Sequence, residues 1–223
     1  MAVYKIYIKK ISFVCTLLLF CIACKEEIKV KEYYYKVYES KDSILYYYQA
    51  VKIVDKNNIR EQITYVYNDI DKKISLKPIE YYKLQGNNML KLGNINSSGR
   101  LYLSTEYVDS CITYGYGNEL YDDVAAITHC FRGKKVIEFE DKHIESYEFF
   151  KIFGLGVTAV SYKVFYDKSF IPIKTERISG YSYINTIVRT NFVPYEFKLL
   201  LNQEQEWVHP ANTDLQSVPD IKR

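Results

Sequence analysis

The feature that most constrains the fold of this chain is a two-residue alternation of side chains, repeated between closely spaced turn signals. At 63–67 (ITYVY) the large residues occupy every second position, and turn-forming runs such as 55–58 (DKNN) and 96–99 (NSSG) separate segments of this kind. Successive strand residues face opposite sides of a sheet, so the pattern indicates antiparallel hairpins. We expect one mostly β domain over 32–202 and a polar, flexible tail over 203–223.

Tyrosine supplies much of this pattern, with 24 residues against 11 Phe and 1 Trp. A tight turn near residue 40 would place Tyr34 opposite Tyr47 in the first hairpin, and a slightly longer loop is the alternative. Together with Tyr114 and Tyr116, these residues form a candidate face on which a sugar or peptide ligand would stack. The alternative is that they are ordinary sheet surface.

One segment, 119–131, has a different period. Leu120, Val124, Ile127 and Phe131 recur at helical spacing, which predicts an amphipathic helix. Its apolar stripe would have only the sheet to pack on. We therefore expect a mostly β fold with one or two helices, in which a curved antiparallel sheet or half-open barrel wraps around this helix.

The N-terminus has the pattern of an export signal. Three lysines within the first ten residues precede an uncharged run at 11–23, which is too short to span a bilayer and suits a signal peptide. The tetrapeptide at 21–24 (CIAC) resembles a bacterial lipobox, in which a small residue precedes the lipidated cysteine. The resemblance implies cleavage before Cys24 and a lipid on that residue, with a tether over 24–31. An ordinary secretion signal and an uncleaved anchor are the alternatives.

The three residues after the cysteine refine this expectation. Lys25, Glu26 and Glu27 resemble the surface-export signal of Bacteroidota lipoproteins, a lysine and two acidic residues directly after the lipidated cysteine. The resemblance implies an outer-membrane lipoprotein displayed on the cell surface. A lipoprotein that faces the periplasm is the alternative.

Net charge argues against a nucleic-acid partner. The formal charge of the whole chain is +3, but the predicted signal carries three lysines and no acid. The mature chain would therefore hold 27 basic and 27 acidic residues. Without a basic excess, binding to phosphate backbones has no electrostatic basis. Attachment to the membrane would come from the N-terminal lipid.

Two cysteines, Cys111 and Cys130, lie beyond the predicted tether. Paired thiols of an exported chain usually form a disulfide, because the compartment is oxidising. We expect this bridge, and two free buried thiols are the alternative.

Two further segments bear on the fold. The segment 143–153 is read as a strand. At 164–174 (VFYDKSFIPIK), a strand, an Asp-Lys turn and a strand entered through Pro are similar to a hairpin of the half-open β-barrels of lipoprotein-carrier type. That resemblance implies an apolar concavity able to hold a ligand.

Motifs of catalysis are missing from the sequence. It contains no nucleophile elbow, phosphate-binding loop or zinc-protease helix, and its one Cys-x-x-Cys pair, at 21–24 (CIAC), is the lipobox-like tetrapeptide itself. Glu138 and Glu140 could form a carboxylate pair, although a solvated strand face explains them more simply. We expect no metal or other cofactor, and a non-enzymatic lipoprotein that binds a ligand or partner. The alternative is a cell-envelope hydrolase with a dispersed site.

Overall fold

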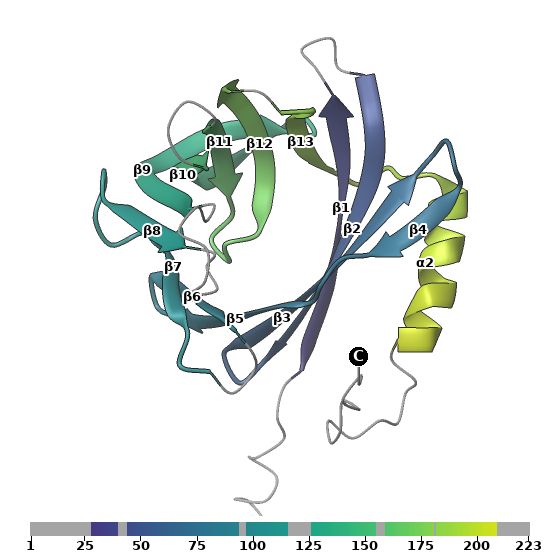
Figure 1. Cartoon of the computed structure of the whole chain (residues 1–223), viewed down its shortest axis with the longest axis horizontal. Helices are drawn as coiled ribbons and strands as arrows, with labels where there is room; N and C mark the ends of the chain where they lie inside the picture. The colour runs from purple at the N-terminus through teal and green to yellow at the C-terminus, as the bar shows by residue number, and fades with distance from the viewer. Residues whose placement is uncertain are drawn as a thin grey trace, which may run out of the picture.

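The alternating segments form a single antiparallel sheet that curves into a barrel, as Figure 1 shows. This computed structural model describes residues 28–39, 44–93, 97–115, 126–154, 159–180 and 182–208. Within those ranges the strands are β1 (Lys29–Glu39), β2 (Ile44–Lys56), β3 (Ile59–Asn68), β4 (Lys73–Leu76), β5 (Glu80–Gln85), β6 (Asn88–Leu92), β7 (Arg100–Ser104), β8 (Cys111–Gly115), β9 (Ala126–Phe139), β10 (Lys142–Phe153), β11 (Val160–Tyr166), β12 (Pro172–Ser179) and β13 (Ile184–Thr190).

The strand order explains why the barrel is nearly closed. The sheet runs β7-β6-β5-β3-β2-β1-β13-β12-β11-β10-β9-β8, with β4 paired to β3 beside this path. The pairing of β1 with both β2 and β13 joins the N-terminal and C-terminal halves of the meander. The two ends of the order, β7 and β8, lie side by side, and no ladder joins them within the described residues. We call this junction the seam. The expected mostly β, curved antiparallel sheet is confirmed.

The described helix, α2 (Tyr195–Val208), follows Pro194 and packs on the outside of the barrel over β1 to β4 (Figure 1). A proline suits the start of a helix because its missing N–H is not needed there. Phe197 and Leu201 lie four residues apart, on one helix face, and both are fully buried. Their partners are outward-facing side chains of the first strands: Tyr48, Ala50, Ile63, Tyr65 and Tyr67.

The predicted helix over 119–131 is wrong for the part that the structure describes. Residues 126–131 belong to β9, and 119–125 lie outside the described residues. The reason is geometric, because residues four apart share a face in a strand as well as in a helix. Ile127 and Phe131 both face the barrel interior from β9. Gly133 has a φ of 102° and lies where the register between β9 and β10 shifts, so β9 has a bulge at this residue.

Two further expectations need correction. Tyr34 pairs with Ala50, and Tyr47 pairs with Val37, so the first hairpin has the longer loop, with a bulge near its tip. The β structure begins at Lys29 and α2 continues to Val208, so regular secondary structure extends beyond the expected domain limits of 32 and 202.

None of the helices in the described part of the chain has the length and apolar character needed to cross a membrane.

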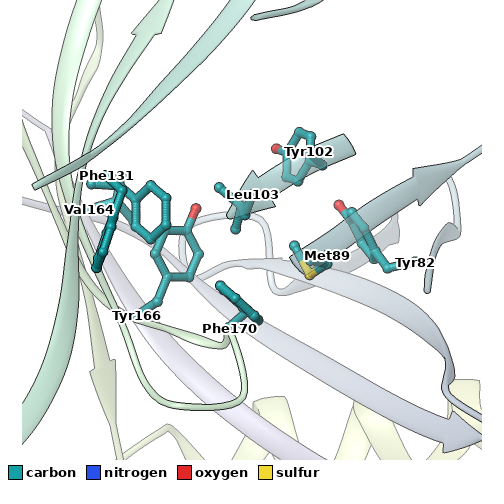
Figure 2. Close-up of a cluster of buried hydrophobic side chains, with 9 residues drawn as sticks. Tyr82, Met89, Tyr102, Leu103, Phe131, Val164, Tyr166 and Phe170 are labelled. Carbon is teal, nitrogen blue, oxygen red and sulfur yellow. The ribbon is translucent and has the colours of Figure 1, made fainter. Parts of the chain in front are cut away.

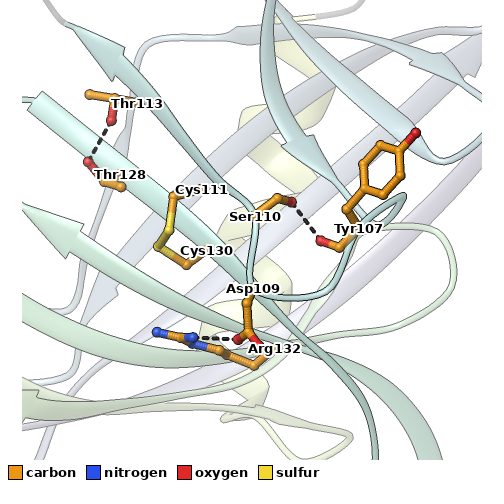
Figure 3. Close-up of a disulfide and its surroundings, with 8 residues drawn as sticks. All are labelled: Tyr107, Asp109, Ser110, Cys111, Thr113, Thr128, Cys130 and Arg132. Atoms are coloured by element: carbon orange, nitrogen blue, oxygen red, sulfur yellow. Dashed lines mark hydrogen bonds and ion pairs between the residues drawn. A yellow bond between two sulfur atoms is a disulfide. The ribbon is translucent and has the colours of Figure 1, made fainter.

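Other expectations are confirmed. The segment 143–153 is strand β10, and 164–174 forms the β11–β12 hairpin around its Asp-Lys turn. Cys111 and Cys130 are bonded, with their Cα atoms 4.0 Å apart (Figure 3). They are directly paired residues of β8 and β9, so the bridge joins two neighbouring strands rather than a strand and a helix.

Candidate functional site

The barrel encloses a cavity of about 330 Å³ between the inner faces of its strands. Its wall combines aromatic and apolar side chains, several of which are drawn in Figure 2, with a smaller polar group. The polar and charged side chains on this wall are Gln49, Gln62, Thr64, Glu80, Lys91, Lys151 and Thr175. A concave, mostly apolar space with a few convergent polar groups is the usual form of a small-molecule site.

The turn between β11 and β12 folds inward and forms part of this wall. Asp167 accepts hydrogen bonds from the backbone N–H groups of Ser169 and Ile171, at 2.9 and 3.0 Å. Arg189 donates to the other oxygen of Asp167 at 3.0 Å, and Arg60 donates to the Ser169 carbonyl at 2.6 Å. These contacts hold Phe170, which has a φ of 57°, in the buried position shown in Figure 2.

Glu80 is the centre of a hydrogen-bonded cluster on the wall. Lys91 Nζ donates to Glu80 Oε1 at 2.6 Å, while Tyr82 Oη and Gln62 Nε2 donate to Oε2 at 3.0 and 3.3 Å. The sheet register produces this grouping, because Gln62 is paired with Glu80 and Tyr82 with Lys91 across adjacent strands. The Lys91 ammonium group also lies 5.5 Å from the centre of the Tyr102 ring.

Lys151 and His129 form a second polar pair, directly opposite each other on β10 and β9. Burial lowers the pKa of Lys151; Glu80 acts in the opposite sense and Lys91 adds to the lowering. Burial also holds the pKa of His129 well below its ordinary value, and the charges of Lys151 and Lys91 lower it further. Lys151 has no hydrogen bond or ion pair to any residue that the structure describes.

At the seam, aromatic rings from β7, β8 and β9 contact one another inside the barrel. The Tyr102 ring, on β7, lies 5.8 Å from that of Tyr114 on β8 and 4.6 Å from that of His129 on β9, both edge-on. Neither nitrogen of His129 has a hydrogen-bond partner among the described residues, although the residue is only 1% exposed. Ring contacts therefore close the inner side of the barrel where the ladder is interrupted.

The structure separates the tyrosines that the sequence suggested as one face. Tyr34 lies under α2, with its ring 6.3 Å from that of Phe197, and burial together with Glu32 raises its pKa to about 12. Tyr114 instead faces the interior beside Tyr102, and Tyr47 is half-buried near Tyr46. Tyr116 lies outside the described residues, as do Cys24 and the residues 25–27.

The carboxylates suggested at the end of β9 occupy a different environment. Glu138 is on the strand, whereas Glu140 is in the following turn with a φ of 48°. Glu140 accepts a hydrogen bond from the Asn191 backbone N–H at 2.9 Å, which gives it a structural partner. In the described ranges, no three His, Cys, Asp or Glu side chains are grouped so that they could hold a metal ion.

No sequence motif predicts the charged residues on the cavity wall, although the position of Lys151 in its strand is one indication. In 147–153 (YEFFKIF), Lys151 falls two residues after Phe149 and therefore on the same strand face. A lysine on the buried face of a strand is unusual, because burying a charge without a partner is costly. Glu80 and Lys91 carry no comparable signal, since their pairing depends on the register of three strands.

Comparison with protein-family models, with curated proteins and with solved structures finds no match to this chain.

Proposed function

We propose that this chain is an exported lipoprotein, attached to the membrane through Cys24, whose barrel binds a small molecule without transforming it. The observation that carries the proposal is the cavity of about 330 Å³ inside the barrel, which has the size and mixed lining of a ligand site. The lipobox-like and export-like residues at 21–27 support the location in the outer membrane, facing the cell surface.

The composition of the wall favours binding over hydrolysis. Of the described residues that line the cavity, Glu80 is the one carboxylate, and it already accepts hydrogen bonds from three side chains. A glycosidase-like mechanism would need a second carboxylate at roughly 5–9.5 Å from the first. A dispersed hydrolytic site of the kind considered from the sequence therefore has little support from this wall.

Blocking the cavity tests the binding proposal. Thr64 lies on the inner face of β3 and lines the cavity, whereas Thr113 lies exposed on the outer face of β8. Thr64→Phe should fill part of the space, and Thr113→Phe places the same bulk in solvent. We expect small molecules that co-purify with the full-length chain, identified by mass spectrometry after denaturation, to be lost from Thr64→Phe alone. Equal recovery from both folded variants would contradict the proposal.

Fractionation tests the location. Cys24→Ser should release the protein from the membrane fraction, and replacing Lys25, Glu26 and Glu27 together with Ala should abolish protease access in intact cells. Retention of Cys24→Ser in the membrane with unchanged mobility would show that another segment is the anchor. Unchanged protease access in the triple variant would remove the export-signal interpretation.

A further inference from the structure

We propose that the ligand of the barrel is a small amphiphilic carboxylate whose single negative charge pairs with Lys151. This inference rests on the proposed binding function and adds the chemical class of the ligand. It is carried by the charges, the uncommitted polar groups and the volume of the cavity.

The charge balance of the wall leaves one cation without a counter-ion. The charged side chains on the described part of the wall are Lys91, Lys151 and Glu80. Lys91 is 8% exposed and lies 2.6 Å from the partly exposed Glu80, so these two charges form a partly buried pair. Lys151 is left as the remaining positive charge, without a hydrogen bond or ion pair to any described residue.

An uncompensated ammonium group inside a barrel is an expensive feature to retain, because desolvation disfavours the charged form. A bound anion would supply the missing partner. Glu80 accepts hydrogen bonds from three donors, one of them Lys91, and its single charge cannot neutralise both lysines, although it also attracts Lys151. The site thus has a place for one negative charge, as on a carboxylate, whereas a phosphate monoester brings about −1.5 to −2.

Two other polar residues of the barrel interior have uncommitted groups. His129, paired with Lys151 across the strands, has both ring nitrogens buried with no hydrogen bond to a described residue, and it is not among the residues that line the cavity. The Tyr166 side chain lines the cavity, and its hydroxyl group makes no hydrogen bond to a described residue. Tyr166 therefore offers a hydroxyl donor on the cavity wall to an acceptor group of the ligand, whereas the buried nitrogens of His129 do not.

The rest of the wall limits the tail of the ligand. Val51, Met89, Ile127, Val164, Phe170 and Ile187 present apolar surface to the same space. A volume of about 330 Å³ corresponds to roughly eleven water molecules at about 30 Å³ each. The cavity therefore suits an aryl-alkanoic or medium-chain acid with on the order of ten non-hydrogen atoms.

Matched pairs of ligands separate charge from shape. We would titrate the full-length chain in detergent micelles with 3-phenylpropanoate, octanoate and decanoate, and with the alcohol that corresponds to each acid, using protein-free micelles as the blank. The variants are Lys151→Met, which keeps the length of the side chain, and Lys135→Met, which removes an exposed charge from β9. Lys151→Gln replaces Lys151→Met if the latter fails to fold by circular dichroism.

The expected result is that at least one acid binds ten times more tightly than its alcohol. Lys151→Met should weaken binding of that acid at least tenfold, leave the alcohol within about twofold, and Lys135→Met should change neither. An alcohol that binds as tightly as its acid, or an acid unaffected by Lys151→Met, would overturn the inference while leaving the binding function standing. Failure of all six compounds to bind below 1 mM would also overturn the inference, whereas the binding function is decided separately by the small molecules recovered with the parent chain and with Thr64→Phe.

Discussion

The two faces of β2 and β3 show how the same strands can produce a filled layer and a cavity. On the outer face, Tyr48 and Tyr67 pack against Phe197 of α2, and the rings of Tyr67 and Phe197 are stacked at 5.0 Å. On the inner face, Val51 and Thr64 line open space. A helix can approach a sheet until side chains interdigitate, whereas opposite walls of a barrel are held apart by its strand number. Packing therefore dominates the outer face, and polar chemistry has room on the inner face.

The largest expected effect is the loss of stability on truncation of Leu201, which we compare with a truncation of similar size on the cavity wall. Leu201, on α2, is 1% exposed, and Met89, on the cavity wall, is 4% exposed. Leu201→Ala should leave a dry void and lower the free energy of unfolding by about 4 kcal/mol, near the upper part of the range of about 2–5 kcal/mol for such changes. Met89→Ala should cost about 2 kcal/mol, because it enlarges a space that already exists.

Urea unfolding followed by circular dichroism measures both free energies. Equal losses would mean that the inner wall is packed as tightly as the layer beneath α2, and the contrast between the two faces would then disappear.

The second prediction concerns the seam. β8 pairs with β9 on one side only, and the disulfide lies on its outer face together with the Thr113–Thr128 hydrogen bond of 3.0 Å (Figure 3). The cysteines are 19 residues apart, so replacing both with Ser should lower the free energy of unfolding by about 3 kcal/mol.

Hydrogen exchange shows whether this loss is local. Amide protection should fall over β8 and the adjoining part of β9 more than under α2, since within the described ranges β8 forms a ladder with β9 alone. A uniform fall over the whole barrel would indicate that the bridge acts on the unfolded chain alone.

These contrasts also mark how far the sequence predicts the fold. Alternation and turn residues identify most strands, because each needs only local information; Asn57 and Asn58, for example, both adopt positive φ in the β2–β3 turn. The helical interpretation of 119–131 fails since a spacing of four fits both periods. α2 is not predicted because its buried stripe, Phe197 and Leu201, lies in its first half and the residues from Gln203 on are mostly polar.

The site was less predictable than the fold. The disulfide follows from a residue count and a compartment, and no register is needed to expect it. The grouping of Glu80 with Lys91 requires the alignment of β3, β5 and β6, and their distance to Lys151 depends on closure of the barrel. A single sequence contains the alternation but not the stagger between distant strands.

The third prediction tests the buried histidine opposite Lys151 by pH. His129 is buried in its neutral form near Lys91 and Lys151, and its pKa lies well below 6.5. As pH falls below 6.5, the unfolded chain takes up a proton that the folded chain refuses, so stability falls by up to about 1.4 kcal/mol per pH unit.

His129→Leu should remove this slope between pH 6.5 and about 5, a range above the titration of most carboxylates. His143→Leu is the matched control, because His143 lies exposed at the start of β10. An unchanged slope in His129→Leu would show that the acid sensitivity arises elsewhere.

The smallest expected effect is the change of stability with pH that Lys151 causes in the absence of ligand. The direction of this change distinguishes a lysine on the inner wall from a lysine on the protein surface. Because burial lowers the pKa of Lys151 below 10.5, the unfolded chain holds its proton to higher pH than the folded chain does. Stability should therefore rise with pH between the lowered pKa and 10.5, and the attraction of Glu80 keeps this rise smaller than the His129 effect. Tyr35 and Tyr82 have raised pKa values and act in the opposite sense above about pH 10, so the measurement must stop there.

Lys151→Met should abolish the rise, whereas Lys135→Met should preserve it. If stability instead fell as pH rose in the parent chain and not in Lys151→Met, the ammonium group would already have a stabilising partner, and the cavity would have no need of an anion.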